Sequence, residues 1–191
     1  MSVLITCTSP HRSTAEVAHQ IADRLVKSGF EARVRSIEQV ESIQSRQPIV
    51  IGSDVRDKDW LPQVERFLRR FSSELVKSPV WLFSTGAESE PSSFGPKLAM
   101  LVADPPSESA GLSGARDTIR IRGHRYFGGA FERGGWSLLG DLFSRICGGS
   151  PPDHRNWRDV NAWAADIARD LQHIDHVQER RRLHLSVRGR P

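Results

Sequence analysis

The chain has 191 residues, which favours a single domain that buries one hydrophobic core without needing a disulfide or a structural metal. Hydrophobic residues make up 38% of the sequence and charged residues 26%, fractions typical of a soluble globular protein. No apolar run approaches the roughly 20 residues of a membrane-spanning helix, and the opening residues do not resemble a signal peptide. The only two cysteines, Cys7 and Cys147, lie far apart, so we expect a cytoplasmic protein without a disulfide framework.

The net charge of +4 comes from the C-terminal end of the chain. Residues 179–191 contain five arginines and one acid, whereas residues 1–178 carry 22 basic and 22 acidic side chains. We therefore expect residues 1–176 to form the folded domain and residues 177–191 to form a basic, disordered tail. Because a nucleic-acid groove needs a basic face on the folded domain, we expect no specific nucleic-acid binding. Contact between the tail and an anionic membrane surface stays open as an alternative.

The first half of the chain alternates short apolar strands with amphipathic helices. Residues 3–7, 48–53 and 79–84 are apolar runs, which predicts strands buried on both faces. Residues 31–37 alternate in polarity, as a strand at the edge of a sheet does. Helical spacing predicts two helices, whose apolar positions are Val17, Ala18, Ile21 and Leu25, closed by Gly29, and then Val64, Phe67, Leu68, Phe71 and Leu75.

The second half begins with a long polar segment and continues with further regular elements. Residues 87–116 are rich in Ser, Pro, Gly and Glu, which predicts a long loop that includes a short helix at residues 96–103. The spacing of apolar residues predicts three later elements, which are a strand at 117–129, a helix at 136–146 and a final helix at 156–174. Short strands separated by helices in this order predict a parallel sheet covered by helices on both faces.

The turn at residues 8–14 follows the first strand and opens the first helix. In an open parallel sheet, ligands bind beyond the carboxyl ends of the strands. The N–H groups of a helix N-terminus suit a phosphate, and this turn adds the side chains of Thr8, Ser9, His11, Arg12, Ser13 and Thr14. The same turn also fits plain helix capping by Ser13 or Thr14, with Glu16 completing a capping box. The spacing alone leaves both interpretations open.

Several segments resemble the flavodoxin-like proteins. Residues 3–18 resemble the first strand, phosphate loop and first helix of that family, and residues 51–61 resemble its second loop. Residues 79–86 resemble the strand that leads to its third loop, while residues 126–130 and 153–164 look like one branch, the menaquinone-dependent protoporphyrinogen dehydrogenases. The resemblance implies a flavodoxin-like α/β fold, with a five-stranded parallel sheet in the order 2-1-3-4-5 and helices on both faces.

The resemblance also implies a non-covalent FMN and its contacts. Its ribityl phosphate would be held by Ser9, His11, Arg12, Ser13 and Thr14. Its isoalloxazine ring would be bordered by Ser53, Asp54, Val55, Arg56, Ser84, Thr85 and Gly86. The chain would then be an FMN-dependent oxidoreductase or electron-transfer protein, acting on a porphyrinogen, a quinone or a similar planar substrate. The chemistry would belong to the flavin.

Three positions depart from the usual pattern of that family. Arg12 stands where the family usually has Gly, whose freedom to adopt a positive φ lets the backbone approach the phosphate. Asp57 stands near the position of an aromatic residue, and Lys58 where the family has a Gly. The alternative hypothesis is therefore a flavodoxin fold that has lost FMN and serves as a non-enzymatic interaction or regulatory module. Trp60 could replace the aromatic residue, although a role as the first core anchor of the following helix is the favoured interpretation.

Other reactive side chains are assigned structural roles. Cys7 ends a buried strand and is expected to be an inert core thiol. His173 and His176 lie one turn apart on a predicted helix but lack a third ligand, so we expect no metal site. A phosphorylated receiver domain shares the predicted topology, but it needs carboxylates at the end of the first strand, where this chain has Cys7 and Thr8.

Overall fold

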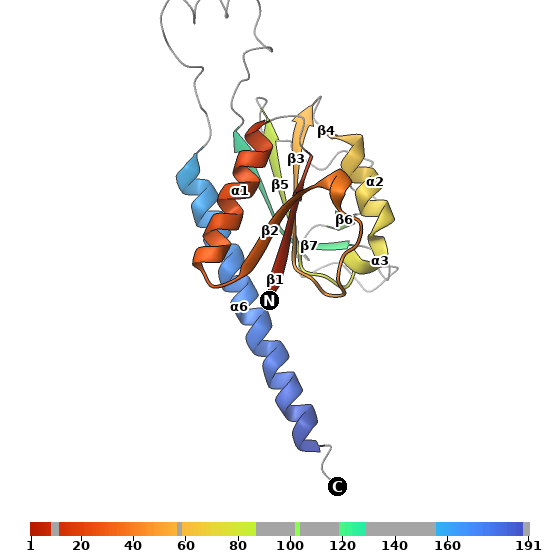
Figure 1. Cartoon of the computed structure of the whole chain (residues 1–191), viewed down its shortest axis with the longest axis vertical. Coiled ribbons are helices and arrows are strands. Elements are labelled where there is room, and N and C mark those ends of the chain that lie inside the picture. The colour runs from red at the N-terminus through yellow and green to blue at the C-terminus, as the bar shows by residue number, and fades with distance from the viewer. Residues whose placement is uncertain (9–11, 57–58, 87–101, 104–118, 129–155, 189–191) are drawn as a thin grey trace, which may run out of the picture.

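The computed structural model describes residues 1–8, 12–56, 59–86, 102–103, 119–128 and 156–188. A central sheet separates two layers of helices, with α1 and α6 on one face and α2 and α3 on the other (Figure 1). The strands are β1 (Ser2–Cys7), β2 (Glu31–Ser36), β3 (Ile49–Arg56), β4 (Asp59–Trp60), β5 (Val80–Gly86), β6 (Val102–Ala103) and β7 (Ile119–Gly128). The helices are α1 (Arg12–Lys27), α2 (Pro62–Arg70), α3 (Ser72–Leu75) and α6 (Trp157–Arg188), with a 3-10 turn, η1, at Ile37–Gln39.

The five longer strands run parallel to one another. Their order across the sheet is β2-β1-β3-β5-β7, which is the predicted order 2-1-3-4-5 when only these strands are numbered. The predicted fold class is therefore confirmed, and so is the edge position of residues 31–36. Two short strands extend the sheet, since β6 pairs in parallel with β7 and β4 turns back to pair antiparallel with β3.

The sheet lies between two hydrophobic cores because successive side chains of a strand point to opposite faces. In β1, Val3 and Ile5 pack toward α1 and α6, whereas Leu4 packs toward α2 and α3. The predicted apolar stripe of α1 is fully buried at Val17 and Ile21. Burying each such side chain stabilises the fold by about 1.5–3 kcal/mol, which explains why the apolar runs of the sequence locate the strands and helices well.

The second predicted helix is interrupted in the structure. Its apolar positions are buried as expected, but the helix breaks at Phe71, whose φ of −110° and ψ of 21° are not helical. The Phe71 ring packs 5.0 Å from the ring of Phe67, between centroids, and Ser72 and Ser73 follow it. The break therefore coincides with a buried aromatic ring and with two serines, which form helices less readily than leucine or arginine. The expectation of one continuous helix over these residues was wrong.

The last helix is longer than predicted. Expected to end at Ile174, α6 continues to Arg188 and projects beyond the sheet (Figure 1). Residues 177–188 are therefore helical in the structure, in place of the predicted disordered tail. Gln178, Glu179 and the arginines that follow are good helix formers, so the helix can propagate past its packed part. No helix in the part of the chain described is long and apolar enough to cross a membrane.

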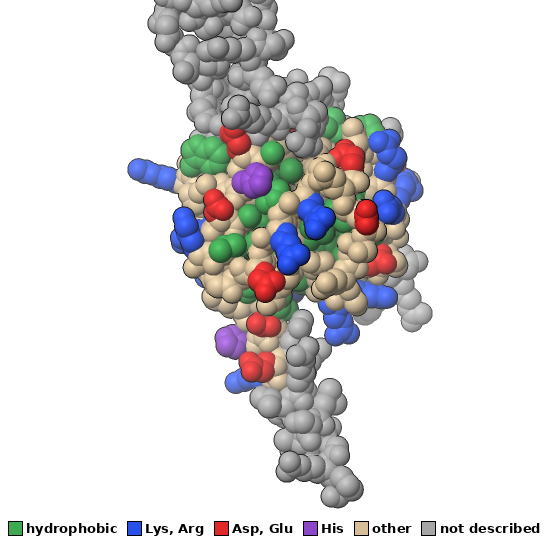
Figure 2. All heavy atoms as spheres, viewed as in Figure 1, with side chains coloured by type: hydrophobic (Ala, Val, Ile, Leu, Met, Phe, Trp, Pro, Cys, Tyr) green, Lys and Arg blue, Asp and Glu red, His purple; other side chains and the backbone are tan. Residues whose placement is uncertain are grey.

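Two further predictions concern the segment before β7. The short helix expected at 96–103 does not extend over its last two residues, since these form β6 and pair with Ile119 and Arg120. The rest of the predicted loop at 87–116 and the predicted helix at 136–146 lie outside the described residues. Figure 2 shows acidic and basic side chains interspersed over the visible face, without a large patch of one sign among the coloured residues.

Candidate functional site

Polar side chains are buried where the central parallel strands end. The register of β3 and β5 places Ser53 beside Ser84 and Asp54 beside Thr85, while Thr8 directly follows β1. Each of these five side chains belongs to a residue that is at most 9% exposed. Burying a polar group is costly unless it finds a hydrogen-bond partner. This carboxyl edge, at the top of Figure 1, is therefore a built polar site rather than an extension of the core.

The N-terminus of α1 meets this edge. Because α1 begins at Arg12, Ser13 and Thr14 lie in its first turn, and both are buried. The Oγ1 atoms of Thr14 and Thr85 are 2.6 Å apart, so a hydrogen bond joins α1 to the end of β5. The first N–H groups of an α-helix have no partner within the helix, which leaves them available to a ligand or a cap. The structure thus brings residues from two of the predicted loops together.

The hairpin formed by β3 and β4 occupies much of the predicted second loop. Val55 pairs with Trp60 and Arg56 with Asp59, so the residues expected in a loop are partly strand. The hydroxyl of Ser53 donates to the carbonyl of Asp54 at 2.8 Å and accepts from the backbone N–H of Leu61 at 3.3 Å. Ser53 therefore holds the hairpin against the start of α2.

Thr8 connects the end of β1 to the same hairpin. Its backbone N–H donates to the carbonyl of Gly52 at 3.1 Å, and its Oγ1 accepts from the N–H of Asp54 at 3.4 Å. These two bonds continue the pairing of β1 and β3 for one residue beyond β1. The sequence suggested Thr8 as a hydroxyl of the phosphate turn, and the structure places that hydroxyl against Asp54.

Trp60, Ser84 and His124 form a hydrogen-bonded chain on the α2 side of the sheet. Trp60 is 8% exposed and packs in the core beneath α2, as the favoured interpretation of this residue predicted. Its Nε1–H donates to Ser84 Oγ at 2.9 Å, and Ser84 Oγ lies 2.8 Å from His124 Nε2. An indole N–H can only donate, so Ser84 Oγ accepts from Trp60, and the tautomer of His124 decides whether Ser84 or His124 donates in the second bond.

Sequence reasoning did not identify His124 as part of the site. The alternation of residues 117–123 located the strand, but the partner of His124 depends on the register between β5 and β7. That register shifts between Val80 and Trp81, after which Leu82 pairs with His124 and Ser84 with Tyr126. A local sequence pattern carries no information about such a shift between distant strands.

Arg12 adopts a helical backbone at the position where a glycine was expected. It is the first residue of α1. Among the described residues other than glycine, Arg46 has a positive φ, of 61°. Arg12 therefore does not need the left-handed conformation that would favour glycine. Of the remaining predicted contacts, Gly86 lies at the end of β5, whereas Ser9 and His11 lie outside the described residues. Asp57 and Lys58, the two other departures from the family pattern, also lie outside them.

Cys7 lies below the site as a core residue. It is buried among the side chains beneath α1. Burial, together with a smaller contribution from the negative charge of Glu38, raises the pKa of its thiol to about 11. The thiol is therefore protonated at neutral pH, and the protonated form is a poor nucleophile. The prediction of an inert core thiol is consistent with this placement.

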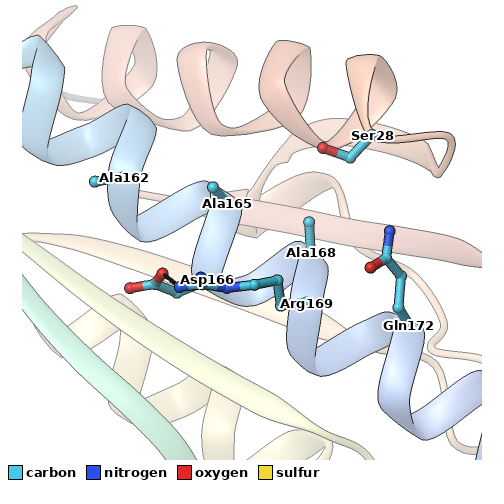
Figure 3. Close-up of a pocket in the computed structure, with 7 residues that line it drawn as sticks. All are labelled: Ser28, Ala162, Ala165, Asp166, Ala168, Arg169 and Gln172. Carbon is cyan, nitrogen blue, oxygen red and sulfur yellow. Dashed lines mark hydrogen bonds and ion pairs between the residues drawn. The ribbon is translucent and has the colours of Figure 1, made fainter.

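A shallow groove lies at the other end of α1, between Ser28 and α6 (Figure 3). Its volume is about 410 Å³, and three alanines of α6 line it together with Gln172 and the ion pair of Asp166 and Arg169. The groove is remote from Thr14, which lies at the opposite end of the helix. The described residues therefore concentrate their buried polar groups at the carboxyl edge and not in this groove.

Comparison with known proteins gives a family and a set of similar folds. A family model described as "Flavodoxin domain" matches residues 4–108, which is more than half of the chain. No curated protein is similar enough in sequence to count as a match. A solved flavodoxin from the domain Archaea is 13% identical, with a TM-score of 0.58, and the match covers 91% of this chain and 100% of that one.

Two further solved structures share the fold. The flavodiiron core from Synechocystis is 12% identical, with a TM-score of 0.56, over 91% of this chain and 36% of that one. A mutant of the flavodoxin from Pseudomonas aeruginosa is 13% identical, with a TM-score of 0.50, over 90% of this chain and 99% of that one. Identities this low establish the fold alone. Together with the match over residues 4–108, the strand order shows that this chain belongs to the flavodoxin domain family.

Proposed function

We propose that this chain binds FMN non-covalently at the carboxyl edge of its sheet and uses it for electron transfer or oxidoreductase chemistry. One observation carries the proposal, namely that buried hydroxyls of Ser13, Thr14 and Thr85 gather beside the N-terminus of α1. Membership of the flavodoxin domain family supports it, as do fold neighbours described as flavodoxins and as a flavodiiron core.

The donors at this edge fit the phosphate of FMN. The first turn of α1 offers backbone N–H groups and the positive end of the helix dipole, which together stabilise an anion. Ser13 and Thr14 add hydroxyls in the same turn. Arg12 lies at the start of the helix and brings a cationic residue to the predicted phosphate loop. A dianionic phosphate would therefore meet donors and positive charge together.

The isoalloxazine end of the site is polar in the described part of the chain. Asp54 lies near the end of β3, and Ser84, near the end of the adjacent β5, is bonded to Trp60 and His124. As placed, the Trp60 ring is packed in the core and its N–H is bonded, so it does not offer a stacking surface. When bound, FMN would supply one- and two-electron transfer. The residues of this chain would bind it, orient it and keep water from the strand ends.

We further propose a planar substrate of the porphyrinogen or quinone type. The support is the sequence resemblance of residues 126–130 and 153–164 to the protoporphyrinogen dehydrogenase branch. Tyr126 pairs with Ser84, and Gly128 pairs with Gly86, so β7 ends at the same edge as β5. A substrate above this edge would contact the end of β7. Oxidation of a porphyrinogen by the FMN-loaded protein, with a naphthoquinone as acceptor, is the matching assay.

The second candidate function is a non-enzymatic module that keeps the fold without the cofactor. The burial of Trp60 favours it, because a flavin usually stacks on an aromatic ring at this loop. The Thr14 hydroxyl is also already engaged by Thr85. Such a module would use its surface for protein contacts and would have no affinity for FMN.

An absorbance spectrum of the purified protein separates the two functions. The protein is first incubated with excess FMN, freed of unbound flavin by desalting, and then scanned from the near-ultraviolet to the blue. Two flavin bands that disappear on reduction with dithionite and return in air support the FMN-dependent function. A colourless protein that leaves flavin fluorescence unquenched supports the non-enzymatic module.

A further inference from the structure

We propose that Thr85 positions the FMN phosphate through Thr14, and does not itself border the isoalloxazine ring. The inference rests on the proposed function, since it concerns the same cofactor. It assigns to Thr85 a role at the opposite end of the cofactor from the one its place in the sequence suggests. Two features indicate this role, namely the direction of the Thr85 side chain and the hydrogen-bonding capacity of the two threonine hydroxyls.

The side chain of Thr85 faces α1 and not the open edge of the sheet. Thr85 follows Phe83 by two positions in β5, and side chains two apart in a strand share a face. Phe83 packs in the core beneath α1 and α6. Thr85 has no exposed surface, and its Oγ1 is 2.6 Å from Thr14 Oγ1 in the first turn of α1. The Thr85 hydroxyl is therefore directed toward the first turn of α1, where the proposed phosphate site lies.

A hydrogen bond between two hydroxyls uses the hydrogen of one hydroxyl and leaves the hydrogen of the other available to a further acceptor. Each threonine hydroxyl has one hydrogen to donate and two lone pairs that can accept. When Thr85 donates to Thr14, the Thr14 hydrogen still needs an acceptor, and both residues are buried. The first N–H groups of α1, which have no partner within the helix, lie in the same turn as Thr14. A phosphate there accepts from the Thr14 hydroxyl and from these N–H groups together.

The direction of the bond between the hydroxyls therefore decides whether Thr14 can bind phosphate. If Thr14 donates to Thr85, Thr14 has no hydrogen left for the ligand. Phosphate oxygens accept hydrogen bonds strongly because they are charged, so a bound phosphate selects the arrangement in which Thr85 donates. Thr85 then donates to a lone pair of the Thr14 oxygen and so directs the Thr14 hydroxyl hydrogen toward the phosphate. Removing the Thr85 hydroxyl should weaken binding of the phosphate and leave contacts with the ring unchanged.

Comparing FMN with riboflavin isolates the phosphate, because riboflavin lacks it. Dissociation constants of both flavins are measured by fluorescence quenching for the wild type, Thr85→Val, Thr85→Ser, Thr14→Val and the Thr14→Val/Thr85→Val double variant. We expect Thr85→Val to weaken FMN about 5- to 10-fold, as the loss of one bond in a charged network does, with riboflavin within about twofold of the wild type. Thr85→Ser should restore FMN affinity. The double variant should bind FMN no more weakly than Thr14→Val alone, because both changes disrupt the same pair of hydroxyls.

Thr6→Val is the matched control. Thr6 is a fully buried threonine of β1 whose Oγ1 has no hydrogen-bond partner in the described part of the structure. Its replacement should leave both dissociation constants unchanged. Circular dichroism and thermal unfolding establish that each variant is folded. Should Thr85→Val not fold, Thr85→Ala, which also lacks the hydroxyl, takes its place beside Thr85→Ser.

Several results would overturn the inference. Equal weakening of FMN and riboflavin by Thr85→Val would place Thr85 at the ring or give it a merely structural role. Unchanged FMN affinity in that variant, failure of Thr85→Ser to restore it, or additive losses in the double variant would each refute the coupling. A wild-type protein that binds neither flavin would refute the proposed function itself, which distinguishes that failure from the others.

Discussion

Gly52 tests how tightly the end of β3 packs beneath α1 and α6. A Cβ atom added at Gly52 would lie 2.1 Å from Cζ of Phe83, and 2.4 and 2.6 Å from its Cε1 and Cε2. Phe83 is fully buried, and its ring centroid lies 6.3 Å from that of Phe127 and 6.4 Å from that of Trp163. The Phe83 ring therefore cannot move aside without displacing two other aromatic side chains.

Gly52→Ala should destabilise the protein by about 2 kcal/mol. Restoring ordinary van der Waals contact requires the Phe83 ring to move by roughly 1.5 Å, and overpacking of this kind costs about 1–3 kcal/mol. The lower backbone entropy of unfolded alanine offsets up to about 1 kcal/mol of that cost. The free energy of unfolding is measured by urea denaturation. Gly123→Ala is the control, because its Cβ would lie 3.6 Å from Trp81 Cδ1, an ordinary contact, and it should be neutral or slightly stabilising.

Replacing Phe83 by a smaller residue should relieve the clash with a Cβ atom at residue 52. In a Phe83→Leu background the aromatic ring is gone, so Gly52→Ala should cost at least about 1 kcal/mol less than in the wild type. Unfolding free energies that are equal for the wild type and Gly52→Ala would refute the packing argument. The same loss in both backgrounds would also refute it, because it would show that Phe83 is not the residue that resists the added methyl group.

Two further predictions concern the core beneath the site. Trp60→Phe removes the N–H that donates to Ser84 and part of a buried ring, so the free energy of unfolding, measured by urea denaturation, should fall by at least about 1 kcal/mol, and a loss near zero would contradict this packing and this bond. In a Cys147→Ser variant, Cys7 should react with a thiol reagent only after unfolding, because its pKa is raised to about 11. The folded state binds this proton more tightly than the unfolded state, so the contribution of Cys7 to stability should be lost as pH rises through about 11, and rapid labelling of the native protein near neutral pH would contradict its burial.

The parallel sheet could be predicted from the sequence because its central strands are buried on both faces, whereas the strand order 2-1-3-4-5 was implied by the resemblance to the flavodoxin-like proteins. Residues such as Ile49–Arg56 and Val80–Gly86 begin as continuous apolar runs, which is the pattern of a parallel sheet covered by helices. Gly29 marks the end of α1 because its φ is +92°, a conformation that costs glycine little. In contrast, the break at Phe71 and the extension of α6 to Arg188 depend on tertiary packing and on helix propagation, which local patterns do not resolve.

The candidate site could be located from the sequence, but its hydrogen bonds could not. Residues at the ends of β1, β3 and β5 meet at one edge because parallel strands have their carboxyl ends on the same side. The bond between Thr14 and Thr85 joins residues 71 positions apart, and it follows from how α1 packs on the sheet. The contact between Ser84 and His124 depends on the register shift in the pairing of β5 with β7. Neither interaction leaves a local signal.

Titration of the flavin-free protein with FMN, followed by flavin fluorescence, tests most directly whether the edge beside α1 binds the cofactor. We predict saturable quenching at a one-to-one ratio, with riboflavin at least about tenfold weaker because the donors at the start of α1 act on the phosphate. Fluorescence that stays unquenched at saturating protein, or equal affinity for FMN and riboflavin, would contradict a phosphate site at this helix N-terminus.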